Sequence, residues 1–344
     1  MLYLGLDVHS KWMTVRGFDP ETGESISFDK VANDAESLHA VFSALPGPLR
    51  GAMESGTNSW AVYRHLEEYF DELLVVDPAT VWGKQVRRGA KTDQRDAMSL
   101  ALKLSKGELV GLYVPDRNTQ DMRALARAKI NASRQVTRLV SEIGSVLRSW
   151  GIIVECSLLS KKGEELLENA KKELPDLSLK VLNLWLGMLK EAQSVEKELD
   201  AAIKLEAKKN EQCKLLMSIP GVGAFTAFVV CAEIGDISRF ESAAHLVSYC
   251  GLSPSVSQSA DKLHYGKLSK FCNRFLKYAL VLRGQDAGRR KADSPFKRTY
   301  WRVAIKNHLN DAKIAVARQL TRVIYAMLKN RQCWDSSRFE HKSA

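Results

Sequence analysis

The chain has 344 residues, of which 45% are hydrophobic, and this length suffices for two domains with hydrophobic cores. This composition excludes an intrinsically disordered chain, which has too little apolar surface to bury. Lysine and arginine number 51 against 40 acids, so the net charge of +11 points toward a polyanionic partner.

The sequence pattern also narrows the cellular setting. The apolar run at 224–232 is shorter than the ~20 residues that a membrane-spanning helix needs. The six cysteines are scattered, with no C-x-x-C pair and no spacing to histidine that suits zinc. The amino terminus enters a predicted strand directly, so no signal peptide is expected. We therefore expect a cytoplasmic protein with reduced thiols and no membrane partner.

The first hundred residues predict an α/β domain in which three strands precede alternating helices and strands. Strands are predicted at 2–7, 12–18 and 25–31 and in two runs ending at Glu54 and Asp77, and helices near 34–45, 58–70 and 93–105. This is the order of a ribonuclease-H-like domain. In that order the first and fourth strands are neighbours.

Four acids lie at the ends of these elements: Asp7, Glu54, Asp93 and Asp96. Asp7 and Glu54 end neighbouring strands, while Asp93 and Asp96 share one face of a helix start. Mg²⁺ binds carboxylate oxygens, and two such ions ~3.5–4 Å apart can clamp a phosphodiester. The simpler explanation of the helical pair is capping and complementarity to the helix dipole.

From about 107 to 205 the pattern is helical and highly charged, and Pro175 ends one helix. Apolar residues recur at three- and four-residue intervals, at positions 181, 185, 188, 192, 195, 199 and 202. This spacing predicts a coiled coil and hence an oligomer. One long helix packed within the same chain explains the spacing as well.

Residues 215–235 resemble a helix-hairpin-helix, with Gly221 and Gly223 in the turn between two helices. Glycines allow close backbone approach, and the amides at the start of the second helix can hold a phosphate. An ordinary tight turn between helices is the alternative.

A polar segment at 249–277 contains four alternating serines, at positions 253, 255, 257 and 259, and then basic residues. Such a segment is usually a flexible loop, and a serine hydroxyl is a weak nucleophile until a base or a metal activates it. His264 lies nearby in the sequence, but the pattern does not select one nucleophile among the four serines.

Basic residues gather beside the third and fourth acids, along the first connector helix and after the serines. Those expected to contact nucleic acid are Lys84, Arg87, Arg88, Lys91, Arg95, Arg123, Arg127, Lys267, Lys270 and Arg274, together with Gly221 and Gly223. Positive groups beside a carboxylate cluster suit a site where metal ions face a phosphate backbone. Solvated basic helix faces are the alternative.

Five motifs occur in order along the chain. They are L-G-L-D-V-H-S-K (4–11), M-E-S-G-T (53–57), K-T-D-Q-R-D-A (91–97), I-P-G-V-G (219–223), and G-L-S-P (251–254) with the following G-K-L-S-K (266–270). With these motifs the chain resembles the DEDD-type insertion-sequence transposases, a family that includes the Piv pilin-gene invertase and members guided by a bridge RNA. The resemblance extends from about residue 2 to about 330.

The resemblance implies a division into domains. It predicts a RuvC-like catalytic domain at 1–106, a helical coiled-coil connector at 107–208, a mainly helical transposase domain at 209–330 and a tail at 331–344. It also implies a bacterial or archaeal protein, associated with the nucleoid when active. The expected partners are donor and target DNA, a guide RNA and further copies of the chain in a dimer or tetramer.

The resemblance also implies roles for single residues. Asp7, Glu54, Asp93 and Asp96 match the acidic quartet that binds Mg²⁺, and Ser259 matches the serine that attacks DNA. In the family a composite site forms between the quartet of one subunit and the serine of another. Two departures, Ala260 and Cys272 where the family has glycine, put the local conformation in question, because such residues tolerate positive φ poorly. Ser257 therefore remains a competitor to Ser259.

Three functions follow from these observations. The first is a transposase or site-specific recombinase, which would insert, excise or, as a pilin-type invertase, invert DNA. The second is a RuvC-like nuclease that hydrolyses DNA with water, and only a covalent protein–DNA adduct separates it from the first. The third is a non-catalytic nucleic-acid binder, against which the complete quartet argues.

Overall fold

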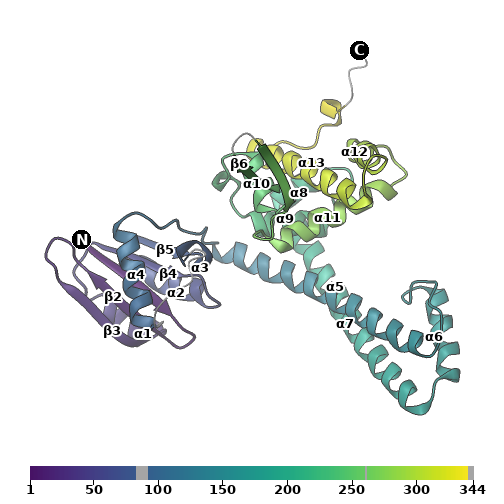
Figure 1. Cartoon of the computed structure of the whole chain (residues 1–344), viewed down its shortest axis with the longest axis horizontal. Coiled ribbons are helices and arrows are strands. Elements are labelled where there is room, and N and C mark those ends of the chain that lie inside the picture. The colour runs from purple at the N-terminus through teal and green to yellow at the C-terminus, as the bar shows by residue number, and fades with distance from the viewer. Residues whose placement is uncertain (83–91, 260–261, 340–344) are drawn as a thin grey trace. The chain divides into compact units, whose positions relative to one another are not determined.

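The computed structural model of the chain describes residues 1–82, 92–259 and 262–339 and divides into two compact units, 1–114 and 115–344 (Figure 1). None of the helices among the described residues is both long and apolar enough to span a membrane.

Unit 1 is built on a five-stranded mixed sheet in the order β3-β2-β1-β4-β5. Its elements are β1 Leu2–Val8, β2 Trp12–Phe18, β3 Ser25–Ala32, α1 Ala35–Phe42, β4 Leu49–Glu54, α2 Ser59–Leu66, a 3₁₀ turn η1 Glu67–Tyr69, β5 Glu72–Val76, α3 Pro78–Trp82 and α4 Asp93–Ser105. β1 pairs with β2 antiparallel and with β4 in parallel. The predicted α/β class is confirmed, and the sheet fits the ribonuclease-H-like order.

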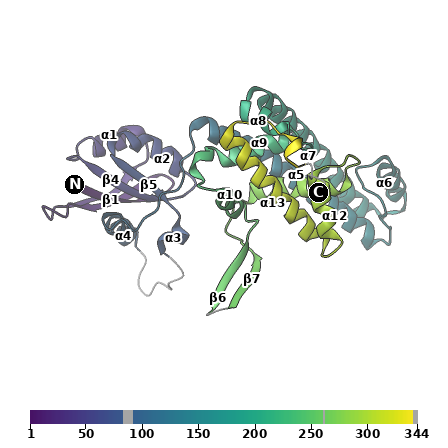
Figure 2. The same cartoon turned by 90° about the horizontal axis from the view of Figure 1, so that it is seen from above.

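The two faces of this sheet are covered by different helices (Figure 2). Alternate residues of β1, such as Leu4 and Leu6, are fully buried in a core that also contains Leu38 of α1 and Leu66 of α2. The opposite face, which includes Ala52, packs against α4. Because side chains alternate along a strand, Tyr3, Gly5 and Asp7 all lie on the α4 side.

The segment after α4 extends unit 1 to residue 114. The amide of Leu112 donates to the carbonyl of Val75 at 2.6 Å, so this segment lies beside β5. Val114 and Leu109 pack on the two cores of the unit. These residues are extended, whereas a helical pattern was predicted from 107, and the long helix begins only at Arg117.

Unit 2 is helical apart from one hairpin. Its elements are α5 Arg117–Ser149, α6 Lys161–Glu173, α7 Asp176–Lys209, α8 Glu211–Met217, α9 Ala224–Ile234, η2 Ile237–Arg239, α10 Ala243–Tyr249, β6 Pro254–Ser259, β7 Lys262–Leu268, α11 Arg274–Arg289, α12 Pro295–Ala304, α13 Leu309–Asn330 and η3 Ser336–Phe339. α9 lies at the centre of the larger core, with every residue from Thr226 to Ile234 buried.

The predicted heptad region forms one long helix, α7, which packs along α5 of the same chain (Figure 1). Leu182 and Leu189 are buried in the core that α7 shares with α5 and α6. Three of the predicted heptad positions, Val181, Met188 and Val195, are exposed by 42%, 54% and 50%. The intrachain helix packing is therefore confirmed, while the intermolecular coiled coil stays a prediction.

Candidate active site

Asp7 and Glu54 lie side by side at the ends of neighbouring strands. β1 and β4 run parallel, and Leu6 pairs with Met53, so the next residues are Asp7 and Glu54. The buried Leu6 and Met53 face the α1 and α2 side, which directs both carboxylates to the α4 side of the sheet. This strand pairing agrees with the prediction that Asp7 and Glu54 lie next to each other on adjacent strands.

Helix α4 supplies the second pair of acids. Its first residue is Asp93, with Asp96 one turn later, and the cap is Thr92, whose hydroxyl accepts from the Arg95 amide at 3.3 Å. Capping therefore does not account for Asp93. The helix can come close because Gly5 has no side chain: a β-carbon there would lie 1.8 Å from the Ala97 carbonyl oxygen.

His9 completes the cluster, and the sequence reasoning missed it. Its Nε2 lies 3.6 Å from Asp7 Oδ2 and 3.2 Å from Asp93 Oδ2. The chain after β1 is held by Asn33 and Asn58, whose amides donate to the His9 carbonyl at 2.7 and 2.8 Å. The signal was present in the D-x-H spacing, because residues two apart along an extended chain face the same side.

The electrostatics of the cluster disfavour a bare carboxylate at Asp7. Burial raises the pKa of Asp7, nearby His9 lowers it, and the charges of Asp93, Asp96 and Glu54 raise it further. The net direction is upward. Three other acids therefore act on Asp7 at this sheet edge, and a bound cation would offset their repulsion.

The donor set fits a divalent cation. Single ligand atoms of Asp7, His9 and Asp93 all lie within 4.8 Å of one another. The Nε2 atom of His9 is shielded from solvent, and its close contacts with Asp7 and Asp93 do not have the geometry of hydrogen bonds. Carboxylate oxygens suit Mg²⁺, whereas an imidazole nitrogen also suits Mn²⁺ and other transition metals.

The predicted serine lies on the second unit, in a hairpin instead of a loop. β6 and β7 pair antiparallel, with Ser259 opposite Lys262 and Ser257 opposite His264. The two strands project from the helices of unit 2 (Figure 2). Ser257 and Ser259 thus occupy equivalent strand positions two residues apart, and the choice between them stays a prediction. Ala260 lies outside the described residues.

The second departure from the family pattern has a simple structural solution. Cys272 does not adopt a positive φ, and Gly251 does, with φ +64°. A β-carbon on Gly251 would lie 2.5 Å from both the β-carbon and the sulfur of Cys272. Gly251, in the turn before β6, therefore makes room for the side chain of Cys272.

The predicted nucleic-acid contacts differ in where the structure places them. Lys84, Arg87, Arg88 and Lys91 lie outside the described residues. The exposed residues are Arg95 on α4, and Lys267, Lys270 and Arg274 around the end of the serine hairpin and the start of α11. Their contact with nucleic acid stays a prediction.

Arg123 and Arg127 are engaged within the protein. Arg127 binds both carboxylate oxygens of Glu233, with Nε–Oε1 at 2.7 Å and Nη2–Oε2 at 2.9 Å. Arg123 donates to the carbonyls of Ala232 and Glu233 at 2.9 and 3.2 Å. The side chain of Arg123 is only 12% exposed, so its geometry favours a structural role over phosphate binding.

The glycines of the helix-hairpin-helix turn differ in their surroundings. Gly221 has φ +93°, and its carbonyl accepts from Arg290 Nη2 at 3.3 Å. A β-carbon on Gly221 would collide with that guanidinium at 2.7 Å. Gly223 is exposed at the N-cap of α9, with open space around it. Of the two glycines, Gly223 is the one with no neighbouring atom within 4 Å of an added β-carbon. Phosphate binding at this turn stays a prediction.

Comparison with known proteins covers most of the chain. A family model of DEDD-type IS110 transposases matches residues 4–151, and the model described as Transposase IS116/IS110/IS902 family matches residues 213–301. The transposase for insertion sequence element IS1111A of Coxiella burnetii is 26% identical over 96% of this chain and 90% of its own length. A probable family 20 transposase of Pseudomonas aeruginosa is 23% identical over 96% and 98%. The pilin gene-inverting protein of Moraxella lacunata is 24% identical over 88% and 83%.

Proposed function

Since the chain belongs to the IS110 family of DEDD transposases, we propose that it exchanges DNA strands by transesterification through Ser259, with Mg²⁺ held by the acidic quartet. The observation that carries this proposal is the convergence of Asp7, His9 and Asp93 from β1, the segment after it and α4. Carboxylate oxygens and an imidazole nitrogen brought together from distant parts of the chain form a ligand set that suits a divalent cation.

Each group in the site has a defined task. Asp7, Glu54, Asp93 and Asp96 would hold the cation, with His9 orienting the Asp7 and Asp93 carboxylates or adding a nitrogen ligand. When bound, the cation supplies polarisation of the scissile phosphate and offsets charge that develops in the transition state.

The serine chemistry proceeds in two balanced steps. The Ser259 hydroxyl gives up its proton as its oxygen bonds to phosphorus, and the bond from phosphorus to the DNA 3′ oxygen breaks. The freed 3′ oxygen takes a proton. A 3′ hydroxyl of the partner strand then attacks the phosphoserine, and Ser259 regains its proton. No phosphodiester is lost to water.

A plasmid recombination assay tests the nucleophile. Ser259→Ala is expected to keep DNA binding and to lose strand exchange, with Ser257→Ala as the matched control on the same strand. Full recombination by Ser259→Ala would rule out this assignment, and loss only in Ser257→Ala would transfer the role to Ser257.

A covalent adduct separates transesterification from hydrolysis by a RuvC-like nuclease. Denaturing electrophoresis of protein incubated with labelled DNA should show a protein–DNA band that Ser259→Ala lacks. Nicked DNA without such a band would favour the nuclease. Full function in Asp7→Ala and Asp96→Ala would instead indicate a non-catalytic binder.

Nucleic acids are the partners that suit this chemistry. The likeness to the Moraxella pilin gene-inverting protein keeps DNA inversion as an alternative outcome of the same reaction. The net charge of +11 suits DNA and a structured guide RNA in the cytoplasm. Purified protein should carry a discrete RNA if it is guided, and sequencing of bound nucleic acid checks this.

A dimer or tetramer is proposed from the apolar stripe on α7. Val181, Leu184, Met188 and Val195 are exposed by 42–62%. Heptad-spaced apolar residues associate through coiled coils. Light scattering should give a mass that is a multiple of the chain, and Met188→Glu should reduce it.

A further inference from the structure

The two ends of the serine hairpin are tied together at its base. The Asn273 amide nitrogen donates to the Tyr249 carbonyl at 2.9 Å, and the Asn273 side-chain amide donates to the Tyr249 hydroxyl at 3.0 Å. Gly251 and Cys272 approach closely beside this pair. The chain thus enters and leaves the segment 250–272 at one point.

Asn273 joins this base to two helices. Its Oδ1 atom accepts from the amides of Phe275 and Leu276 at 3.1 and 2.9 Å, which caps α11. Its Nδ2 atom also donates to Glu233 Oε2 at 2.7 Å. One short side chain therefore connects the hairpin base, the start of α11 and the central helix α9.

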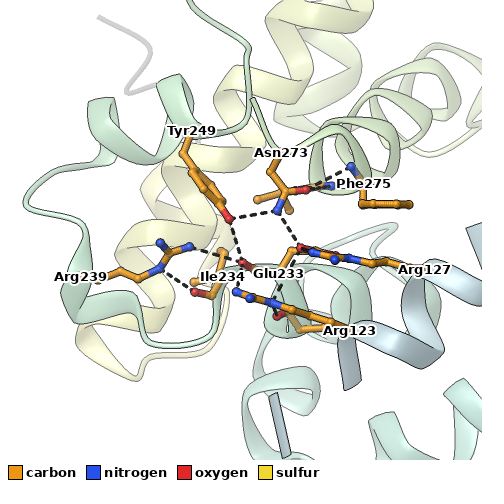
Figure 3. A network of polar contacts seen from close by, with 10 residues as sticks. Arg123, Arg127, Glu233, Ile234, Arg239, Tyr249, Asn273 and Phe275 are labelled. Atoms are coloured by element: carbon orange, nitrogen blue, oxygen red, sulfur yellow. Dashed lines mark hydrogen bonds and ion pairs between the residues drawn. The ribbon is translucent and has the colours of Figure 1, made fainter. Parts of the chain in front are cut away.

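Glu233 is fixed more firmly than an ordinary carboxylate. Its side chain has no solvent exposure, and its two oxygens bind Arg127 of α5 and Asn273 (Figure 3). Arg123 and Arg239 hold backbone carbonyls at the same end of α9, those of Ala232, Glu233 and Ile234. A buried charge without partners is strongly unfavourable, so the geometry of this network is tightly constrained.

The hairpin itself has little else to set its direction. Its strands form a separate two-stranded sheet and pair only with each other among the described residues. An isolated two-stranded hairpin is marginally stable in water. Its direction must therefore come from its base.

We propose that Glu233 and Asn273 form a positioning pair that anchors the base of the hairpin to α9 and α5 and thereby directs Ser259. This inference rests on the proposed role of Ser259. Neither residue contacts the reacting atoms. Their effect passes through the backbone at Tyr249 and Asn273 into the two strands.

Reciprocal substitution tests the pair in the full-length protein. Asn273→Asp keeps the oxygen that caps α11 but places a second carboxylate against Glu233. The double variant Asn273→Asp with Glu233→Gln again pairs one amide with one carboxylate. The amide is then at position 233 and the carboxylate at position 273. Tyr325→Phe is the control, because the Tyr325 hydroxyl donates to the carbonyls of Phe240 and Glu241 and not to Glu233 or Asn273.

Two readouts separate positioning from general destabilisation. Hydrogen exchange of peptides within 254–268 should rise in Asn273→Asp, return toward wild type in the double variant and stay unchanged in Tyr325→Phe. The single-turnover rate of adduct formation at saturating DNA should fall by roughly 10- to 100-fold in Asn273→Asp, with unchanged DNA affinity, because small misplacements of reacting groups have effects of this size.

The two readouts test two different parts of the proposal: the anchoring of the hairpin and the role of Ser259. Unchanged hairpin exchange in Asn273→Asp overturns the positioning pair, as does a double variant no better than the single one. Absence of any adduct in wild type overturns the role of Ser259 and the catalytic consequence. The exchange experiment then still decides whether the pair holds the hairpin.

Discussion

Gly5 of β1 and Ala97 of α4 touch through their backbones: a β-carbon on Gly5 would lie 1.8 Å from the Ala97 carbonyl oxygen and 2.8 Å from the Ala101 amide nitrogen. This contact determines the distance between the sheet and the helix that carries Asp93 and Asp96. Glycine at this strand position therefore belongs to the construction of the acidic cluster.

Gly5→Ala is expected to push α4 away from the sheet. Overpacking of a core costs about 1–3 kcal/mol, and here the colliding atoms belong to the backbone, which cannot rotate away. Divalent-cation affinity should fall as well, because Asp93 moves relative to Asp7. Thermal unfolding and cation titration measure the two effects. Gly56→Ala is the control, since its β-carbon would meet only Asn58 Oδ1 at 4.0 Å, and an equal loss in both variants would contradict the explanation.

Divalent cations should stabilise unit 1. A ligand at ten times its dissociation constant adds about 1.4 kcal/mol to the free energy of unfolding. Calorimetry with Mg²⁺ or Mn²⁺ should show this increase in wild type and in Glu36→Gln, an exposed acid on α1, but not in Asp93→Asn. A cation response that survives in Asp93→Asn would place the ion elsewhere.

Asp7→Asn should stabilise the cation-free protein while removing the cation response. The pKa of Asp7 is raised by burial and neighbouring acids, although His9 opposes this, so the charged form is disfavoured in the fold. The protonated Asp7 side chain contributes to stability at pH values below the ordinary pKa of aspartate. This contribution is lost as pH rises through the higher pKa that Asp7 has in the folded protein. At pH 7 removal of the charge should raise the melting temperature by a few degrees. A lower melting temperature would contradict this account.

Arg127→Ala should strongly destabilise unit 2. Removing one partner of a fully buried ion pair costs about 3–5 kcal/mol. Glu233 is fully buried but Arg127 is 41% exposed, so the loss should lie at or below the lower end of this range. Arg134→Ala is the matched control, since Arg134 stacks on Phe275 and Tyr278 without contacting Glu233. Urea unfolding of both variants compares the losses. Equal losses would mean that Glu233 finds another partner.

Glu196 should make the α5–α7 pairing sensitive to acid. Burial alone would raise its pKa, but hydrogen bonds from Ser133 and Lys129 outweigh burial and lower it below the ordinary value of 4.5. Its stabilising contribution is therefore present above pH 4.5 and lost as pH falls through the folded pKa. Glu196→Gln should lower stability by about 1 kcal/mol at pH 7 and have little effect near pH 3. A deficit that is independent of pH would contradict the assignment.

Lys267, Lys270 and Arg274 should bind DNA phosphates. Their joint replacement by glutamine is expected to weaken DNA binding and to lower the salt dependence by roughly 0.9 for each phosphate that is no longer neutralised. Replacing Lys180, Lys190 and Lys197 on α7 removes the same charge elsewhere in unit 2. Fluorescence anisotropy over a salt series compares the triple variants, and equal slopes would indicate a purely long-range effect.

Local pattern accounts for most of unit 1. The strands predicted at 2–7, 12–18 and 25–31 agree with β1, β2 and β3 to within one residue. The helix start at Asp93 was also predicted, from the three-residue spacing of Asp93 and Asp96, and the structure shows Thr92 as its cap. The prediction failed at 107–114, which was included in the charged helical region although only Glu108 is charged there. In the structure the Leu112 amide donates to the Val75 carbonyl of β5 instead.

Tertiary contacts account for what pattern could not supply. The surroundings of Arg123 and Arg127 depend on Glu233, over a hundred residues away, so a basic helix face and a buried ion pair look alike in the sequence. The role of His9 was hidden in the same way, because its neighbour Asp93 comes from a distant helix.

The strands of unit 1, the helix start at Asp93 and the presence of four acids at the ends of these elements were determined by the sequence alone, because periodicity and capping act between near neighbours in the chain. Only the tertiary structure decided which helix face meets which strand. It places His9 beside Asp7 and Asp93, and it brings the Asn273 side chain within hydrogen-bond distance of Glu233. These relationships arise from backbone contacts such as that between Gly5 and Ala97, whose partners are close in space and distant in sequence.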